Sequence, residues 1–334
     1  MSTMKAFVLE GPRELRAIET RIPEPGLDEV RVKVAYVGIC GSDVEAYLGH
    51  RKPEFLGHPL MLGHESAGII DKVGERVGGI KVGDRVMFAT WGSFTEYVVC
   101  KPDRVVKLLP EIPLIEGSLI EALPGVIQAA AMTGIRYSHE VVVVGQGLSG
   151  LLITRLVALN GCRRLIAVDL FDEKLELARE FGASHTVNAR SENVVGRVKE
   201  ISEGGADFSI MATLSGNDVR PAVEWSRMHS KIVLYGSTGP CDGIDFFRVH
   251  CKALSIVKET TEMRGQLERW RLWREGMQLV ADGLLPIARL RTHLFPLGQL
   301  PEAMELRATP RPDVIHVLIE NDWAREKRLA GESL

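Results

Sequence analysis

The sequence predicts an α/β fold of two domains, a β-rich domain and a doubly wound domain built on a parallel sheet. Three observations predict it. The 334 residues exceed the size at which one hydrophobic core usually stops growing. Up to about residue 107, short strands are broken by glycine and proline. From about residue 125, apolar strand-like runs alternate with helical stretches.

The first part of the chain is predicted to be a mostly β, barrel-like domain. Residues 4–8 are strand-like, residues 30–34 alternate between apolar and polar, and residues 67–73 are apolar. The run Gly-Asp-Arg-Val at residues 83–86 indicates a turn that enters another strand.

The second part is predicted to be the doubly wound domain. Buried parallel strands of this domain are expected over residues 141–144, 164–168, 207–211 and 231–235.

The rest of the chain follows a strand over residues 253–257. We expect a long helix over residues 264–282 and further strands over 290–295 and 314–319, followed by a charged, mobile tail over 322–334.

The returning strands assign residues 1–122 and 263–334 to the β-rich domain and residues 123–262 to the doubly wound domain. In this arrangement the second domain is an insertion in the first. We therefore expect the functional site in the cleft between them.

Composition and charge argue against nucleic acids and membranes as binding partners. A formal charge of −3 with both signs interspersed argues against a nucleic-acid partner. No apolar run approaches the roughly 20 residues of a membrane span, and the N-terminus lacks a signal-peptide pattern. Five widely scattered cysteines indicate reduced thiols rather than a disulfide framework. These features predict a cytoplasmic protein that acts on a small molecule, without a membrane partner.

A glycine-rich turn follows the strand at residues 141–144 and precedes a helical stretch. This context predicts a dinucleotide site, with one glycine for the tight turn, one for the approach of the pyrophosphate and one for helix packing. Backbone amides at the start of the helix would face the phosphates. The residues expected to contact the cofactor here are Gly145, Gly147, Leu148, Ser149 and Gly150.

Asp169 ends the next predicted strand, 24 residues after Gly145. That spacing is close to the ~20 residues expected of the acidic residue that binds the adenosine ribose hydroxyls. Leu170 and Phe171 follow Asp169, and neither is an arginine that could bind the 2′-phosphate of NADP. NAD is therefore favoured over NADP.

A metal site is predicted from Cys40, His64, Glu65 and Glu121. Cys40 sits in a polar turn flanked by glycines, and His64 and Glu65 are adjacent between Gly63 and Ser66. Mixed sulfur, nitrogen and oxygen donors are typical of a catalytic zinc that keeps one position open. Whether Glu65 or Glu121 is the third ligand stays open.

The whole chain, over about residues 4–320, resembles the zinc-dependent medium-chain alcohol and polyol dehydrogenases, a superfamily that includes sorbitol and threonine dehydrogenases. The resemblance implies a GroES-like catalytic domain, a Rossmann NAD-binding domain, one catalytic zinc per chain and NAD-linked oxidation of a hydroxylated small molecule. It rests on motifs in the family's order at residues 38–43, 63–68, 83–86, 92–97, 145–150 and 181–183.

The resemblance also implies roles for single residues. Ser42 would take the proton of the substrate hydroxyl, and Lys174 would contact the adenosine ribose. Glu45 stands where relatives commonly carry a proton-relaying histidine, so either Glu45 or nearby His50 is expected to take that role. The lobe with four cysteines that binds a structural zinc in many relatives is expected to be absent, because no cysteine lies between Val86 and Cys100.

The sequence offers candidates for the substrate class and for the oligomeric state. Lys258, Glu259 and Thr260 hint at a sugar alcohol, cyclitol or sugar derivative, and Trp91 is a candidate for lining the pocket. Family precedent favours a homo-oligomer, either a dimer or a tetramer. The alternatives are a zinc-free reductase of the same fold, which would need neither the cysteine nor the Gly-His-Glu run, and a non-enzymatic NAD-binding protein.

Overall fold

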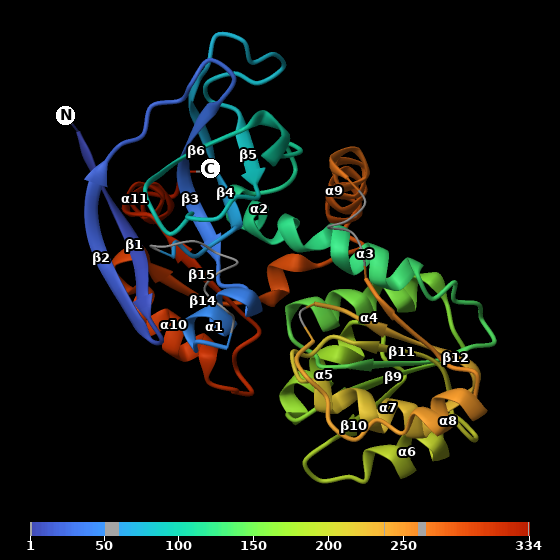
Figure 1. Cartoon of the computed structure of the whole chain (residues 1–334). Coiled ribbons are helices and arrows are strands. Elements are labelled where there is room, and N and C mark those ends of the chain that lie inside the picture. The colour runs from blue at the N-terminus through green and yellow to red at the C-terminus, as the bar shows by residue number, and fades with distance from the viewer. Residues whose placement is uncertain (1, 51–59, 237, 260–264, 333) are drawn as a thin grey trace. The chain divides into compact units, whose positions relative to one another are not determined.

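The computed structural model describes residues 2–50, 60–236, 238–259, 265–332 and 334, and it divides into two compact units (Figure 1). Unit 1 comprises Met1–Leu123, Trp270–Pro310 and His316–Leu334, and unit 2 comprises Pro124–Arg269 and Arg311–Ile315. The domain boundary expected between residues 122 and 123 lies one residue from this division. The boundary expected between residues 262 and 263 lies outside the described residues.

Unit 1 is built on two sheets. A small antiparallel sheet pairs β1 with β2, and a larger mixed sheet has the order β14-β15-β3-β4-β5-β7, with β6 also pairing with β3. The strands are β1 (Thr3–Gly11), β2 (Glu14–Arg21), β3 (Val30–Gly38), β4 (Glu65–Val73), β5 (Arg85–Phe88), β6 (Tyr97–Cys100), β7 (Val105–Lys107), β14 (Arg291–Pro296) and β15 (His316–Glu320).

β3 is the central strand of the larger sheet, and all of its residues except Lys33 are buried. It runs antiparallel to β4, with Gly38 opposite Glu65, and antiparallel to β15, with Leu318 opposite Gly38. The end of β3 therefore meets the start of β4 and the middle of β15. These three strands bring together chain segments that are far apart in the sequence.

Helices connect the strands of unit 1, and the one over Gln266–Ala281 begins in unit 2. The α-helices are α1 (Gly41–Tyr47), α2 (Leu114–Gly117), α9 (Gln266–Ala281), α10 (Leu300–Ala308) and α11 (Asp322–Leu329). The 3-10 helices are η2 (Pro102–Arg104), η3 (Ser118–Ala122), η6 (Ile287–Leu290) and η7 (Leu297–Gln299). The helix expected over residues 264–282 is α9, and Arg264 lies outside the described residues.

The expectation of a mobile C-terminal tail is wrong, because most of it forms α11. The indole of Trp323 donates a hydrogen bond to the carbonyl of Val34 on β3 at 2.7 Å. Arg328 pairs with both oxygens of the buried Glu320 carboxylate at 2.8 and 2.9 Å. The charged residues therefore anchor the helix on the sheet instead of leaving it in solvent.

Unit 2 is a six-stranded parallel sheet in the order β10-β9-β8-β11-β12-β13, with helices on both faces (Figure 1). This confirms the doubly wound fold. Its strands are β8 (Glu140–Val144), β9 (Arg164–Asp169), β10 (His185–Asn188), β11 (Ala206–Met211), β12 (Ser226–Leu234) and β13 (Ser255–Lys258). Its helices are α3 (Leu123–Ala131), α4 (Leu148–Asn160), α5 (Asp172–Glu180), α6 (Val194–Ile201), η4 (Gly216–Asp218), α7 (Val219–Trp225) and α8 (Phe246–Cys251).

β8 lies inside the sheet and is buried on both faces. Val142 and Val144 pack in one hydrophobic cluster with Val198 of α6 and Trp225 of α7. Val141 and Val143 point to the other face and are fully buried. A strand fixed from both sides holds the turn that follows it, and this turn carries the glycine motif.

The continuous helical stretch Leu114–Ala131 has the length and hydropathy of a membrane-spanning helix. It corrects the expectation that no apolar run approaches that length. However, 72% of the stretch is buried within the protein, as in the core helix of a folded domain.

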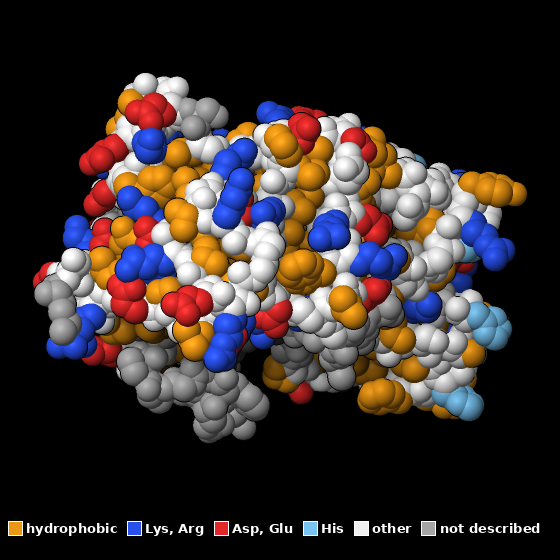
Figure 2. Space-filling view, turned by 90° about the horizontal axis from the view of Figure 1, so that it is seen from above, with side chains coloured by type: hydrophobic (Ala, Val, Ile, Leu, Met, Phe, Trp, Pro, Cys, Tyr) orange, Lys and Arg blue, Asp and Glu red, His pale blue; other side chains and the backbone are white. Residues whose placement is uncertain are grey.

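Basic and acidic side chains are intermixed on the face drawn in Figure 2 rather than gathered by sign. This agrees with the interspersed charges of the sequence, whose formal net charge is −3.

The glycine turn yields a stability prediction. A Cβ at Gly150 would lie 1.7 Å from the carbonyl oxygen of Gly145, so Gly150→Ala forces the turn to shift. Overpacking of this kind costs about 1–3 kcal/mol, and we expect a lower melting temperature by circular dichroism.

Gly147→Ala is the matched control, because a Cβ at Gly147 meets nothing within 4 Å. Reduced entropy of the unfolded chain, about 0.4–1 kcal/mol, offsets the poorer helix capping by alanine. Its melting temperature should therefore stay close to that of the wild type. Equal melting temperatures for the two variants would contradict the assigned roles.

Candidate metal and dinucleotide sites

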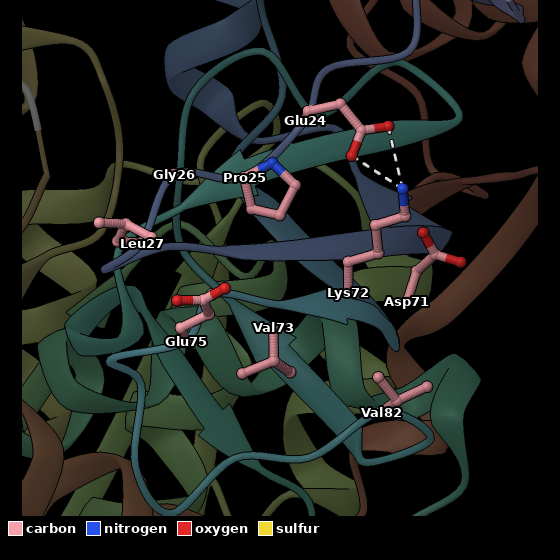
Figure 3. A pocket seen from close by; sticks show the side chains of 10 residues that line it. Glu24, Pro25, Gly26, Leu27, Asp71, Lys72, Val73, Glu75 and Val82 are labelled. Carbon is pink, nitrogen blue, oxygen red and sulfur yellow. Dashed lines mark hydrogen bonds and ion pairs between the residues drawn. The ribbon is translucent and has the colours of Figure 1, made fainter.

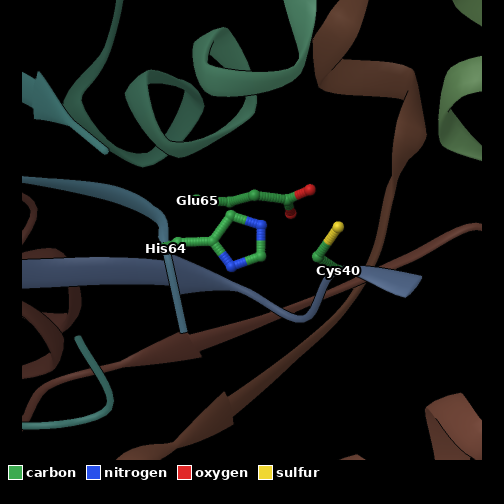
Figure 4. A group of neighbouring side chains, drawn as sticks. All are labelled: Cys40, His64 and Glu65. Atoms are coloured by element: carbon green, nitrogen blue, oxygen red, sulfur yellow. The ribbon is translucent and has the colours of Figure 1, made fainter. Parts of the chain in front are cut away.

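Three metal-binding side chains converge in unit 1. The sulfur of Cys40, a ring nitrogen of His64 and a carboxylate oxygen of Glu65 all lie within 4.8 Å of one another (Figure 4). Cys40 lies between β3 and α1, His64 directly precedes β4, and Glu65 is the first residue of β4. The antiparallel pairing of Gly38 with Glu65 brings these segments together.

Asp43 organises this group, and its side chain is 0% exposed. One carboxylate oxygen accepts the amide hydrogen of Cys40 at 2.9 Å, and the other accepts that of Gly63 at 2.9 Å. The carboxylate also lies 3.6 Å from Nδ1 of His64. Asp43 therefore links the loop that carries Cys40 to the loop that carries His64.

The orientation of His64 follows from its two neighbours. Because Nδ1 faces Asp43, Nε2 is the nitrogen on the side of Ser42, whose hydroxyl oxygen lies 3.5 Å away. A histidine with one ring nitrogen facing a carboxylate presents the other nitrogen to a metal. Asp43 was not predicted as a functional residue, although an acidic residue three positions after a helix N-cap is a capping signal.

The protein environment shifts the pKa values of the three donors. Burial raises the pKa of the Cys40 thiol, and the charge of Glu65 raises it further. Burial lowers the pKa of His64, but Asp43 and Cys40 outweigh it and leave that pKa well above 6.5. Burial raises the pKa of Glu65, but His316 and His64 outweigh it and leave that pKa below its usual range.

The donors fit a zinc ion. Sulfur, imidazole nitrogen and carboxylate oxygen are all zinc ligands, and three protein donors leave a fourth position open, as in catalytic sites. The carboxylate of Glu65 is also buried, with 4% of its side chain exposed, and a metal ion would compensate the burial of its charge.

Glu121 is not one of the three converging residues. It lies on η3, and its backbone carbonyl accepts a hydrogen bond from the indole of Trp273 at 3.3 Å. Of the two carboxylates left open by the sequence, the structure therefore brings Glu65, and not Glu121, together with Cys40 and His64.

The two relay candidates contact each other. Nδ1 of His50 lies 3.3 Å from Oε1 of Glu45, which lies in the last turn of α1. Neither residue belongs to the described group formed by Cys40, His64 and Glu65. Their relay role stays a prediction.

The substrate candidates differ in their surroundings. The ring of Trp91 lies 4.3 Å from that of His64, measured between centroids, and 41% of Trp91 is exposed. Trp91 thus borders the metal-binding group. Lys258 ends β13 in unit 2, Glu259 after it is buried, and Thr260 lies outside the described residues.

The glycine turn in unit 2 has the geometry of a phosphate-binding turn. Gly145 adopts a φ of +87°, which favours glycine. Gly147 precedes α4 and provides no side-chain cap. The amides of Leu148 and Ser149 in the first turn of α4 have no partner within the helix, so they can bind an anion, and the helix dipole favours its charge.

Two buried polar residues that were not predicted from the sequence hold this turn. The amide nitrogen of the Gln146 side chain donates to the carbonyl of Val143 at 2.9 Å. The hydroxyl of Thr154 on α4 donates to the side-chain oxygen of Gln146 at 2.9 Å. The glycine pattern contains no signal for either contact: the first is a local bond back to β8, and the second depends on how α4 packs beside the turn.

Asp169 lies at the end of β9, next to the turn. One carboxylate oxygen accepts the backbone amide of Gln146 at 2.7 Å, and the other accepts those of Leu170 and Phe171 at 2.7 and 3.2 Å. These bonds fix the carboxylate beside the glycine turn, where the adenosine ribose is expected.

Two cations flank Phe171 near this carboxylate. The guanidinium of Arg190 lies 4.1 Å from the ring centre, and the ammonium of Lys174 lies 5.3 Å from it. The sequence has no arginine directly after Asp169, and Arg190, which follows β10, was not predicted to lie near this position.

A hollow of about 430 Å³ lies elsewhere in unit 1 (Figure 3). It is lined in part by Glu24 and Lys72, which form an ion pair at 2.8 Å, and by the exposed side chains of Leu27 and Val82. None of the predicted site residues lines it. This surface offers no arrangement of catalytic groups.

Comparison with known proteins agrees with the two-unit structure. Residues 26–111 match the family model described as alcohol dehydrogenase GroES-like domain, and residues 150–282 match the one described as zinc-binding dehydrogenase. A D-xylulose reductase of Saccharomyces cerevisiae is 32% identical over 91% of this chain and 94% of its own length. A sorbitol dehydrogenase of Bacillus subtilis is 26% identical over 95% of this chain and 97% of its own.

A solved structure from Escherichia coli extends the likeness to three dimensions. It is described as a short chain alcohol dehydrogenase complexed with NADH, and it is 27% identical with a TM-score of 0.83, covering 96% of this chain and 100% of its own. The GroES-like and Rossmann folds and the resemblance are thereby confirmed, and the family uses a dinucleotide cofactor. The chain belongs to the zinc-type medium-chain dehydrogenase/reductase superfamily.

Proposed function

We propose that this protein is a zinc-dependent, NAD-linked dehydrogenase. It oxidises a secondary alcohol of a polyol, cyclitol or sugar derivative to a ketone, and it catalyses the reverse reaction. The observation that carries this proposal is the convergence of Cys40, His64 and Glu65 within 4.8 Å.

In unit 1, Cys40, His64 and Glu65 would hold one zinc ion, which supplies a Lewis acid that makes a substrate hydroxyl more acidic. Ser42 takes the hydroxyl proton, since its oxygen lies 3.5 Å from Nε2 of His64 and thus beside the group. Transfer onward to solvent through Glu45 or His50 is part of the proposal.

In unit 2, the turn at Gly145 to Gly150 and the amides of Leu148 and Ser149 hold the pyrophosphate of NAD. Asp169 accepts the ribose hydroxyls, and Lys174 contacts the same ribose. When bound, NAD would supply the acceptor of a hydride from the substrate carbon, while Ser42 takes the hydroxyl proton. The products are a ketone, NADH and a proton, so that atoms and charge balance.

The names of the relatives support the substrate class, because sorbitol and xylulose are polyhydroxylated. Trp91 supports it as well, since an indole face can pack on the C–H groups of a sugar chain. A zinc-free reductase remains disfavoured, because it would leave three converging metal-binding side chains without a role.

We also propose a cytoplasmic location and a homo-oligomer, either a dimer or a tetramer. The five cysteines are free thiols, which suits a reducing compartment. The proposed partner is a small hydroxylated molecule rather than a nucleic acid or a membrane.

Metal content tests the proposed zinc site. Protein purified without added metal should contain about one zinc per chain by native mass spectrometry, consistent with the loss of a structural lobe. Cys40→Ala should lose this zinc, because it removes the thiolate ligand. Cys100→Ala is the matched control, since this buried cysteine lies outside the group and its loss should leave zinc bound. Two zinc ions per chain, or zinc retained in Cys40→Ala, would contradict the assignment.

Removal of the Ser42 hydroxyl tests the proton step. Ser42→Ala should lower kcat for polyol oxidation by roughly 10²–10⁴-fold, the usual contribution of a positioned proton acceptor. The zinc content should not change. Ser42→Thr keeps a hydroxyl and should retain most of the activity. Full activity in Ser42→Ala would exclude this residue from the reaction.

Cofactor preference tests the adenosine end of the site. The wild type should prefer NAD, because the Asp169 carboxylate repels a 2′-phosphate. Asp169→Asn removes the charge and should reduce the ratio of kcat/KM for NAD over NADP by roughly tenfold, which corresponds to about 1.4 kcal/mol.

Arg190→Ala is the counterpart variant, and it should lower NADP turnover while leaving NAD turnover nearly unchanged. A wild type that prefers NADP would overturn the assignment of NAD.

A further inference from the structure

A buried histidine, His316, contacts Glu65 of the metal-binding group. His316 begins β15, and its side chain is 1% exposed. Its Nε2 lies 3.1 Å from Oε2 of Glu65, whose side chain is 4% exposed. Neither atom has an aligned hydrogen-bond partner in the described structure. The two groups therefore form a close polar contact that is not a straight hydrogen bond.

Gly38 leaves the space that this contact occupies. A Cβ at Gly38 would lie 2.4 Å from Oε2 of Glu65 and 2.5 Å from Nε2 of His316. Gly38 pairs with Glu65 on β4 and with Leu318 on β15. The contact thus lies over the central strand, where the ladders fix the backbones of all three residues.

A purely structural ion pair is a poor explanation of this arrangement. Removing two charged groups from water costs several kcal/mol each, and attraction repays this cost only when the geometry is good. Here Nδ1 of His316 is also buried without a partner. The contact has a physical explanation if the Glu65 carboxylate also binds a metal ion.

His316 itself does not join the donors. The described group of mutually close ligand atoms contains Cys40, His64 and Glu65, and not His316. The imidazole therefore acts on the group through Glu65. Carboxylates that bind metals are usually held by such outer contacts, which orient them and tune their basicity.

We propose that His316 is the positioning residue of the metal site, holding the Glu65 carboxylate so that Glu65 serves as the third protein ligand. Nε2–H faces Oε2 of Glu65 and occupies one oxygen of the carboxylate, which limits Glu65 to one donor oxygen. Gly38 provides the space for this contact. The inference rests on the proposed zinc site and extends it to a residue on a different strand.

The test measures the zinc dissociation constant of the full chain by competition with a chromophoric chelator. His316→Leu replaces the imidazole with an apolar side chain of similar size and removes both ring nitrogens. It should weaken zinc binding roughly 10–100-fold, the usual effect of losing an outer contact to a ligand. The melting temperature of the metal-free protein should change little by comparison.

His316→Gln is the matched variant, because its side-chain nitrogen can reach the position of Nε2. It should restore zinc affinity to within roughly threefold of the wild type, since it returns the donor to Glu65. A merely structural histidine would not produce this rescue at equal stability.

A double-mutant cycle locates the effect. In a Glu65→Gln background, His316→Leu should cause no further loss of zinc affinity, because the residue through which it acts is already changed. Equal zinc affinity in the wild type and His316→Leu would overturn the inference and leave the proposed function intact. A wild type that binds no zinc would overturn both.

Discussion

The buried carboxylate of Asp43 is the constraint on which the metal-binding group depends. It accepts amide hydrogens from Cys40 and Gly63 and faces Nδ1 of His64, so one side chain fixes both loops that carry the donors. Hydrogen bonds to a charged group contribute about 1.5–3 kcal/mol each. Without the Asp43 carboxylate, the loops that carry Cys40 and His64 would lose the hydrogen bonds that join them.

The strands of unit 1 supply the rest of the arrangement. Antiparallel pairing sets Glu65 opposite Gly38, and β15 brings His316 to the same place from the far end of the chain. Unit 2 achieves comparable rigidity by another route, in which Gln146 and Thr154 tie the glycine turn to its strand and helix. In both units the reactive groups lie at strand ends, and buried polar contacts determine their orientation.

Much of this was predictable from the sequence because it depends on local patterns. Apolar runs predicted strands such as β8 and β9. The glycine pattern predicted the turn, and the distance from Gly145 predicted the role of Asp169. The missed features depend on tertiary contacts. β10 is short and largely polar, α11 is held by Trp323 and Arg328, and neither Asp43 nor His316 has a local pattern that reveals its neighbours. The choice between Glu65 and Glu121 likewise required the register of β3 and β4.

The central claim is that Cys40, His64 and Glu65 form one catalytic zinc site. The most direct measurement is X-ray absorption at the zinc K-edge on the full-length protein. We expect a four-coordinate shell with one sulfur at about 2.3 Å and nitrogen or oxygen donors at about 2.0–2.2 Å. A shell of four sulfurs, or one without sulfur, would contradict it.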